Sequence, residues 1–173
     1  MRALLAAAIV AVVASLLTGC GKSTPQQAKQ TTASGEASPA AVPPPAAPLT
    51  DAQKKTALAS LPAAFQVADI DNGQAKFAIC KSCHTAVQGG GAMVGPNLYG
   101  VFGRKAGTSP GFAYSDGLRN FGIVWDAASL DKWITNPHAV VPGTKMTYIG
   151  MSDAKDRTDL IAYLKVATSP APA

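Results

Sequence analysis

Cys80, Cys83 and His84 form the pattern C-x-x-C-H, in the run ICKSCH near the middle of the chain. Three chemistries use such a pair of thiols: a redox disulfide, half of a zinc site, and the covalent anchor of a haem. The other residues of the chain have to distinguish among the three.

A redox disulfide of the thioredoxin kind needs a strand leading into the cysteines and a parallel sheet around them. The residues before Cys80 instead have a helical pattern, and no alternating strands follow. A zinc site needs four nitrogen or sulfur donors, and beyond C-x-x-C-H the chain offers only His138 and Cys20. Two thiols three residues apart lie on one helical face, where they suit the two vinyl groups of one haem. The pattern therefore favours covalent haem attachment, with His84 delivered to the iron.

The first twenty residues predict export. Arg2 precedes an uncharged apolar run, Ala3 to Leu17, which is too short for a comfortable membrane span and is typical of a secretory signal. The letters LTGC that follow resemble the bacterial lipobox, whose cysteine becomes a lipidated N-terminus; an ordinary signal cleaved nearby is the alternative. We expect a signal peptide at residues 1–19, a lipid anchor on Cys20, and a location on the periplasmic side of a bacterial membrane, inner or outer.

Composition divides the remainder of the chain. Residues 20–65 are rich in Ala, Pro, Ser, Thr and Gln and predict a linker, in which Thr50 and Gln53 match a capping box for a short helix at 51–61. We expect the globular domain at 66–168 and a disordered tail at 169–173. From Gln66 onward ten cations stand against eight aspartates, a net charge of +2, compared with +5 for the whole chain. No basic cluster carries interleaved aromatic residues, so nothing supports nucleic-acid binding.

Three helices are expected in the domain. Asp69 or Asp71 can cap the first, which runs through Phe77 to about Cys83. Asp126 caps a second helix, ended by Pro137, and Ser152-Asp153 begins the last, with Leu160, Ile161 and Leu164 at helical spacing. The segments between them are rich in glycine and proline and leave much of the core unfilled. A large apolar group has to complete it.

Several further stretches carry a family resemblance. They are GQAKFAICKSCH, GPNLYGVFGRKAG with SPGFAYSDG after it, IVWD, NPHAVVPGTKM and DLIAYLK. In this order, over roughly Asp69 to Thr168, they resemble class I cytochrome c of the mitochondrial and bacterial c2 kind. The resemblance implies an all-α fold, with three main helices and long Gly/Pro-rich loops wrapped round one haem c that is covalently bound through Cys80 and Cys83.

The resemblance also implies the iron ligands. The residues alone leave Met93, Met146, Met151 and His138 as candidates for the sixth position. Carried over from the family, His84 is the proximal ligand and Met146 the distal one. The Pro96 carbonyl is expected to accept a hydrogen bond from the second nitrogen of His84, which fixes the tautomer of the ring.

Four more residues match positions that surround the haem in the family. Tyr114 and Trp125 match hydrogen-bond donors to a buried propionate, Arg104 matches the cation near it, and Thr144 matches the hydroxyl beside the methionine. Without the resemblance, Tyr114 and Trp125 are each explained as ordinary core aromatic residues.

The chain departs from the family pattern in two regions. Trp133 stands where tyrosine is usual on the distal side, and Leu118 where asparagine is common. Met93, His138 and Ala139 occupy positions where lysine is frequent, so the family's ring of lysines is reduced and steering of an acidic partner is weakened. A docking patch around Ile79, Met93 and Val94 is the hypothesis that follows.

The function implied is that of a monomeric one-electron carrier, not an enzyme, that shuttles electrons between respiratory membrane complexes. The expected donor is a quinol-oxidising cytochrome bc-type complex, and the acceptor a terminal oxidase or a peroxidase. A haem-containing peroxidase or a gas-binding or sensing protein is the alternative, because either requires only that the sixth position be vacant or easily vacated.

Overall fold

The computed structural model describes residues 50–169. The expected signal peptide, Cys20 and most of the expected linker lie outside these residues, as does all but the first residue of the expected tail. The described elements, in chain order, are α1 (Asp51–Ala59), α2 (Ala63–Gln66), α3 (Ile70–Phe77), the 3-10 helix η1 (Cys80–Ser82), α4 (Asp116–Arg119), α5 (Ala127–Thr135), α6 (Pro137–Val140) and α7 (Ala154–Thr168).

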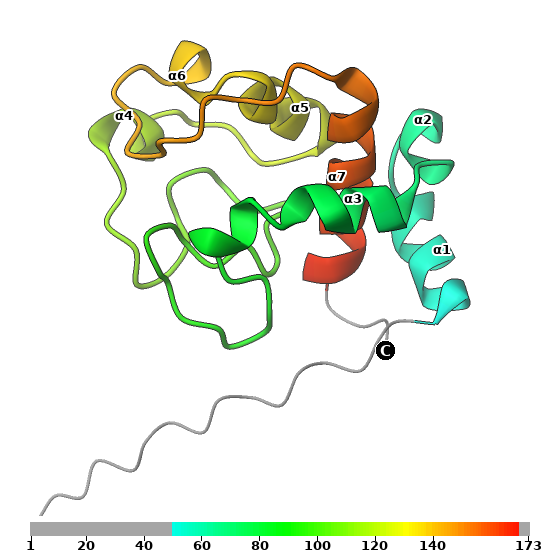
Figure 1. Cartoon of the computed structure of the whole chain (residues 1–173). Coiled ribbons are helices and arrows are strands. Elements are labelled where there is room, and N and C mark those ends of the chain that lie inside the picture. The colour runs from blue at the N-terminus through cyan, green and yellow to red at the C-terminus, as the bar shows by residue number, and fades with distance from the viewer. Residues whose placement is uncertain (1–49, 170–173) are drawn as a thin grey trace, which may run out of the picture. The chain divides into compact units, whose positions relative to one another are not determined.

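The described part of the chain is helical, and its only β pairing is a single bridge between Lys105 and Val124. Figure 1 shows α3 crossing α7, with α1 and α2 on one side of α7 and the α4–α6 region on the other. The expectation of an all-α fold is thereby confirmed. Within residues 50–169, no helix combines the length and the hydropathy needed to cross a bilayer.

The crossing of α3 and α7 depends on a glycine. A Cβ added to Gly73 would lie 2.1 Å from the carbonyl oxygen of Asp159 and 2.7 Å from the Cβ of Tyr163. Only a residue without a side chain allows the two helices to come this close. One turn further along α3, the ring of Phe77 packs at 5.4 Å from that of Tyr163, and Phe77 is buried.

A buried carboxylate fastens the same crossing. Asp159 is 2% exposed and accepts hydrogen bonds from the backbone N–H of Asp69 at 2.9 Å, from the Asn72 amide at 2.7 Å and from Lys155 at 2.5 Å. Burial alone would raise the pKa of Asp159, but these three donors outweigh it and hold the pKa below its usual value. The carboxylate is therefore charged at neutral pH and ties the start of α3 to α7.

Side-chain caps set where the three helices expected from the sequence, α3, α5 and α7, begin. Asp69, Asp126 and Asp153 each accept a hydrogen bond from the backbone N–H three residues on. Such caps satisfy one of the N–H groups that a helix start leaves free. The expected start of each helix is thus correct, with Asp69 rather than Asp71 as the first cap.

The end of α3 differs from the expectation. The helix ends at Phe77 and does not continue to Cys83; a separate 3-10 turn, η1, carries the first cysteine. The carbonyl of Cys80 accepts both the N–H of Cys83 at 3.1 Å and that of His84 at 2.9 Å. The Ser82 hydroxyl donates to the carbonyl of Ile79 at 2.7 Å, a local bond that competes with a regular helix.

α1 and α2 belong to the packed body, although the domain was expected to begin at Gln66. The capping box between Thr50 and Gln53 is present, and α1 ends at Ala59, two residues before the expected end. Leu58 and Leu61 are 7% and 8% exposed and join the main apolar cluster. Within the described residues, the packed structure therefore includes α1 and α2.

Candidate functional site

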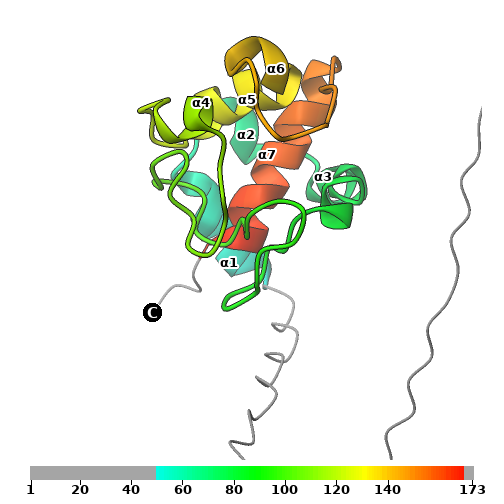
Figure 2. The same cartoon turned by 90° about the vertical axis from the view of Figure 1, so that its left-hand side faces the viewer.

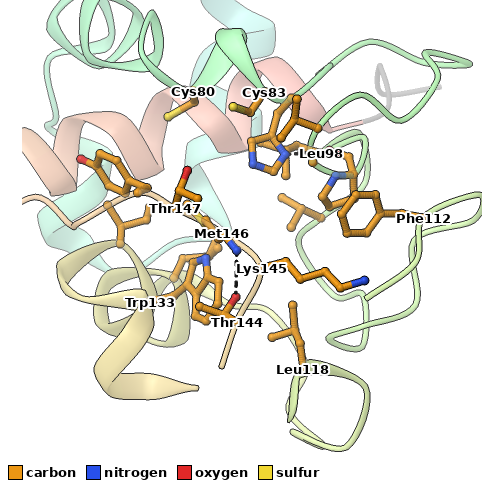
Figure 3. A pocket seen from close by; sticks show the side chains of 18 of the residues that line it. Cys80, Cys83, Leu98, Phe112, Leu118, Trp133, Thr144, Lys145, Met146 and Thr147 are labelled. Atoms are coloured by element: carbon orange, nitrogen blue, oxygen red, sulfur yellow. Dashed lines mark hydrogen bonds between the residues drawn. The ribbon is translucent and has the colours of Figure 1, made fainter. Parts of the chain in front are cut away.

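A cavity of about 450 Å³ lies between the segment that carries the cysteines and the loop that follows α6. Figure 3 shows Cys80 and Cys83 on one side of this cavity, and Thr144, Met146 and Trp133 on the opposite side. The volume lies within the range of small-molecule and cofactor sites. This cavity is the unfilled part of the core that the loop-rich sequence predicts.

The cysteine wall is formed by η1. Cys80 and Cys83 both line the cavity, both are partly buried, and both are free thiols. Burial raises the pKa of the Cys80 thiol to about 11. Thiol-based redox catalysts and zinc ligands depend on the thiolate, which a raised pKa disfavours. Cys80 is therefore a neutral thiol at neutral pH.

His84 is held in one orientation by the loop that faces it. Its Nδ1 lies 2.8 Å from the carbonyl oxygen of Pro96, so Nδ1 carries the proton and donates it, and Nε2 is left with its lone pair. Burial lowers the pKa of the imidazole, against the opposing effect of the Pro96 carbonyl. A neutral imidazole with a free Nε2 is the form that binds metals. The backbone N–H of Gly95 donates to the Cys83 carbonyl at 2.8 Å and holds the loop in place.

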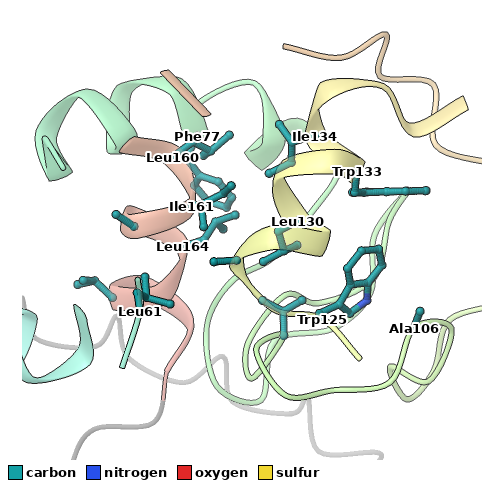
Figure 4. Close-up of a cluster of buried hydrophobic side chains, with 14 of the residues drawn as sticks. Leu61, Phe77, Ala106, Trp125, Leu130, Trp133, Ile134, Leu160, Ile161 and Leu164 are labelled. Atoms are coloured by element: carbon teal, nitrogen blue, oxygen red, sulfur yellow. The ribbon is translucent and has the colours of Figure 1, made fainter. Parts of the chain in front are cut away.

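The opposite wall comes from the loop after α6. Met146 is partly buried and lines the cavity together with Thr144, Trp133 and Tyr148. The N–H of Met146 donates to the Thr144 hydroxyl at 3.3 Å, the contact drawn as a dashed line in Figure 3. The Trp133 ring packs at 5.6 Å from that of Trp125, and Figure 4 shows both rings beside α5.

A polar corner completes the lining. Arg104 donates hydrogen bonds from its guanidinium to the carbonyls of Tyr99 at 2.9 Å and of Asn97 at 3.0 Å. Burial lowers the pKa of Arg104, and the nearby Tyr114 acts in the opposite direction. Tyr114 and Trp125 are both 8% exposed and line the same cavity. One fixed cation and two groups with N–H or O–H donors could receive an anionic group here.

The structure therefore gathers all nine residues predicted to contact the cofactor, from Cys80 to Met146, around one cavity. It separates them from the other candidate ligands. Met93 and His138 are exposed, Met151 packs against the core, and none of the three lines the cavity. In residues 50–169, no three His, Cys, Asp or Glu side chains gather as a zinc site would require.

Some lining residues were not singled out from the sequence. Phe112 packs edge-on against Tyr114 at 4.8 Å between ring centroids, and Tyr148 lies two residues after Met146. In both pairs the two residues stand two apart, and both side chains line the same cavity. That alternation is the signal that could have found them.

The residues present fit a covalently bound haem. Two thiols stand on one wall, an oriented imidazole follows them, a thioether faces them, and most of the lining between is apolar. A covalently attached haem with two protein ligands uses each of these: two attachment points, a ligand on each side of the iron, and an apolar sleeve. The backbone of Gly95 also packs directly against the His84 ring, since a Cβ added to Gly95 would lie 2.4 Å from Cε1 of His84.

Comparison with known proteins agrees with this fit. The family model described as cytochrome c matches residues 70–168. Cytochrome c2 of Rhodomicrobium vannielii is 46% identical over 101 residues, which is 58% of this chain and 81% of that protein. Cytochrome c of Sesamum indicum is 42% identical over 102 residues, 58% of this chain and 92% of that protein.

Among solved structures, cytochrome cH from Methylobacterium extorquens superposes with a TM-score of 0.53 at 47% identity, over 56% of this chain and 97% of that one. The matched family region holds every residue that lines the cavity. It begins after α1 and α2, which are additions to it. The chain belongs to the cytochrome c family.

Proposed function

We propose that this protein is a one-electron carrier that holds one haem c through thioether bonds from Cys80 and Cys83, with His84 and Met146 as its axial ligands. The observation that carries the proposal is that His84, Met146 and the two thiols line one largely apolar cavity, with Met146 on the side opposite Cys80 and Cys83 (Figure 3). When bound, the haem supplies an iron that alternates between two oxidation states.

The chain's own residues suit electron transfer rather than substrate chemistry. His84 is oriented by Pro96, and Met146 is fixed by its backbone contact to Thr144. With both axial positions filled by protein, no position is left for oxygen or a peroxide, and methionine ligation favours a high reduction potential. Arg104, Tyr114 and Trp125 line the same cavity and would receive a buried propionate.

We further propose the setting in which the carrier works. The N-terminal sequence supports export and a lipid anchor on Cys20, so the domain would work as a monomer on the periplasmic side of a bacterial membrane. Its partners would be a quinol-oxidising cytochrome bc-type complex as donor and a terminal oxidase or a peroxidase as acceptor. Intact mass of the purified protein tests the anchor.

Replacing Met146 tests the ligation. We expect Met146→Leu to remove the weak far-red absorption band that methionine ligation gives ferric haem, to lower the reduction potential, and to let the reduced protein bind carbon monoxide. Met151→Leu is the matched control, because Met151 is also partly buried but does not line the cavity. It should leave all three properties unchanged.

Two results would overturn the proposal. Carbon monoxide binding by the unmodified protein would show that the sixth position is open and would support a gas-binding or peroxidase role. An intact mass without added porphyrin would remove the cofactor altogether. Stopped-flow oxidation of the reduced protein by membranes of its own host, with and without oxidase inhibitors, then tests the acceptor.

A further inference from the structure

Met146 lies in the loop that joins α6 to α7, residues 141–153, which we call the Met146 loop. Figure 1 and Figure 2 both show this loop returning from α6 past α5 to the start of α7. Among the described residues, no backbone-to-backbone hydrogen bond involves residues 145–150. The part of the loop that carries the methionine is therefore held chiefly through its two ends.

The first end of the loop is fastened by three contacts near Thr144. The N–H of Thr144 donates to the Val141 carbonyl at 3.1 Å, and its hydroxyl accepts from the N–H of Met146 at 3.3 Å. The ammonium of Lys145 donates to the Ala113 carbonyl at 2.8 Å. These bonds fix where the loop begins, and its return to α7 depends on other groups.

The second end is fastened by one guanidinium, that of Arg157 in the first turn of α7. One terminal nitrogen of Arg157 donates to the carbonyls of Met151 at 3.0 Å and Ser152 at 2.8 Å. Its Nε donates to the carboxylate of Asp131, on α5, at 2.7 Å, and the Arg157 side chain is only 11% exposed. A planar guanidinium with donors in fixed directions suits such a junction, which joins the loop, α5 and α7.

The same end of the loop packs closely against the end of α5. The N–H of Met151 donates to the Ile134 carbonyl at 2.9 Å. Gly150 has a φ of 111°, and a Cβ added to it would collide with the Thr135 carbonyl. Met146 precedes Met151 by five residues, so a displacement of this end reaches the methionine through the segment that lacks backbone hydrogen bonds.

We propose that Arg157 is a positioning residue for Met146: through the two carbonyls and Asp131, it holds the end of the loop so that the thioether stays at the cavity. The inference rests on the proposed function, in which Met146 is an axial ligand. Arg157 does not itself line the cavity, so it acts on the ligand only through the loop. The alternative role is purely structural, an ion pair that joins α7 to α5.

Replacing Arg157 by lysine in the full-length, haem-containing protein separates these two roles. Lysine keeps a positive charge for Asp131, but it lacks the planar fork that reaches both carbonyls. Imidazole added to the ferric protein is the probe, because it binds the iron where Met146 leaves it. We expect Arg157→Lys to bind imidazole about tenfold more tightly than wild type, which corresponds to about 1.4 kcal/mol and to the net contribution of a hydrogen bond.

Asp159→Asn is the matched control. It removes another buried charge of α7, whose bonds to Asp69 and Asn72 lead toward α3 and not to the loop. It should destabilise the domain and yet leave the dissociation constant for imidazole within about twofold of wild type, because the loop contacts are unchanged.

A second variant approaches the junction from its other side. The Asp131 side chain is 39% exposed, so Asp131→Ala should fold normally. It leaves the two carbonyl bonds in place but frees the guanidinium, and imidazole should bind about threefold more tightly than to wild type.

Equal imidazole affinities of Arg157→Lys and Asp159→Asn would overturn the inference, as would an Asp131→Ala variant that binds imidazole no more tightly than wild type. If Arg157→Lys does not fold, Asp131→Ala decides alone. A wild-type ferric protein without the far-red band of methionine ligation would instead refute the proposed function, because Met146 would then not be a ligand.

Discussion

Gly95 lies against the imidazole of His84, where even the smallest side chain would collide with the ring. A Cβ at this position would come 2.4 Å from Cε1, 2.7 Å from Nδ1 and 2.8 Å from Nε2, whereas ordinary contact begins at 3.4 Å. Gly95→Ala therefore requires the ring or the loop to move by about 1 Å. Neither moves freely, because Nδ1 is bonded to the Pro96 carbonyl at 2.8 Å and the loop to the Cys83 carbonyl.

The cost follows from these contacts. Overpacking a filled site costs about 1–3 kcal/mol, and loss of the bond between His84 and Pro96 adds about 1 kcal/mol. The backbone of Gly95 does not adopt a positive φ, so alanine is compatible with it. By reducing the conformational entropy of the unfolded chain, alanine offsets about 0.5 kcal/mol of this loss of stability. We expect a net loss of about 1.5–3.5 kcal/mol in the free energy of unfolding, together with a shift in reduction potential, since the ring is an expected ligand.

Guanidinium unfolding of the haem-containing protein, followed by circular dichroism, measures the loss. Gly91→Ala is the control: it changes the same residue type in the same loop, where an added Cβ meets nothing within 4 Å. It should be neutral or slightly stabilising. If both variants unfold at the same denaturant concentration, the loop does not hold His84 as the contacts imply.

Two more predictions concern the packing that supports the site. Asp159→Asn should lower the free energy of unfolding by about 1–3 kcal/mol at pH 7. The pKa of Asp159 is depressed in the folded state. The ionised carboxylate therefore stabilises the fold above the ordinary carboxyl pKa range, and this stabilisation is lost as the pH falls through the pKa of the folded state. The difference from wild type, measured by denaturant unfolding, should therefore shrink below about pH 4, and an equal difference at pH 7 and pH 3 would contradict this. Leu61→Ala should cost about 2 kcal/mol or more, because the side chain is 8% exposed, and Val67→Ala, 87% exposed, should be neutral. Equal stability of these two variants would show that the segment joining α1 to α2 is not integral to the fold.

The parts of the structure that could be predicted from sequence are those fixed by local chemistry. A cap such as Asp126 depends only on one side chain and the backbone N–H three residues on. In C-x-x-C-H, the short spacing alone keeps the two thiols and the imidazole close together. The short helices α4 and α6 have four residues each. Helices of this length are stable only with tertiary contacts, so no local sequence pattern predicts them. The early end of α3 has a different origin: it depends on local bonds in and around η1, which the helical spacing of the apolar residues does not reveal.

The packing of α1 and α2 was also missed, although α7 carried a signal for it. Leu160 and Leu164 line the cavity, whereas Ile161 and Ala162 do not line it and are 0% exposed. A helix that is apolar on more than one side needs more than one partner. Figure 4 shows Leu61 on the side of α7 away from α5. The second apolar side of α7 therefore calls for a segment outside the family region, and the residues before Ile70 are the ones that supply it.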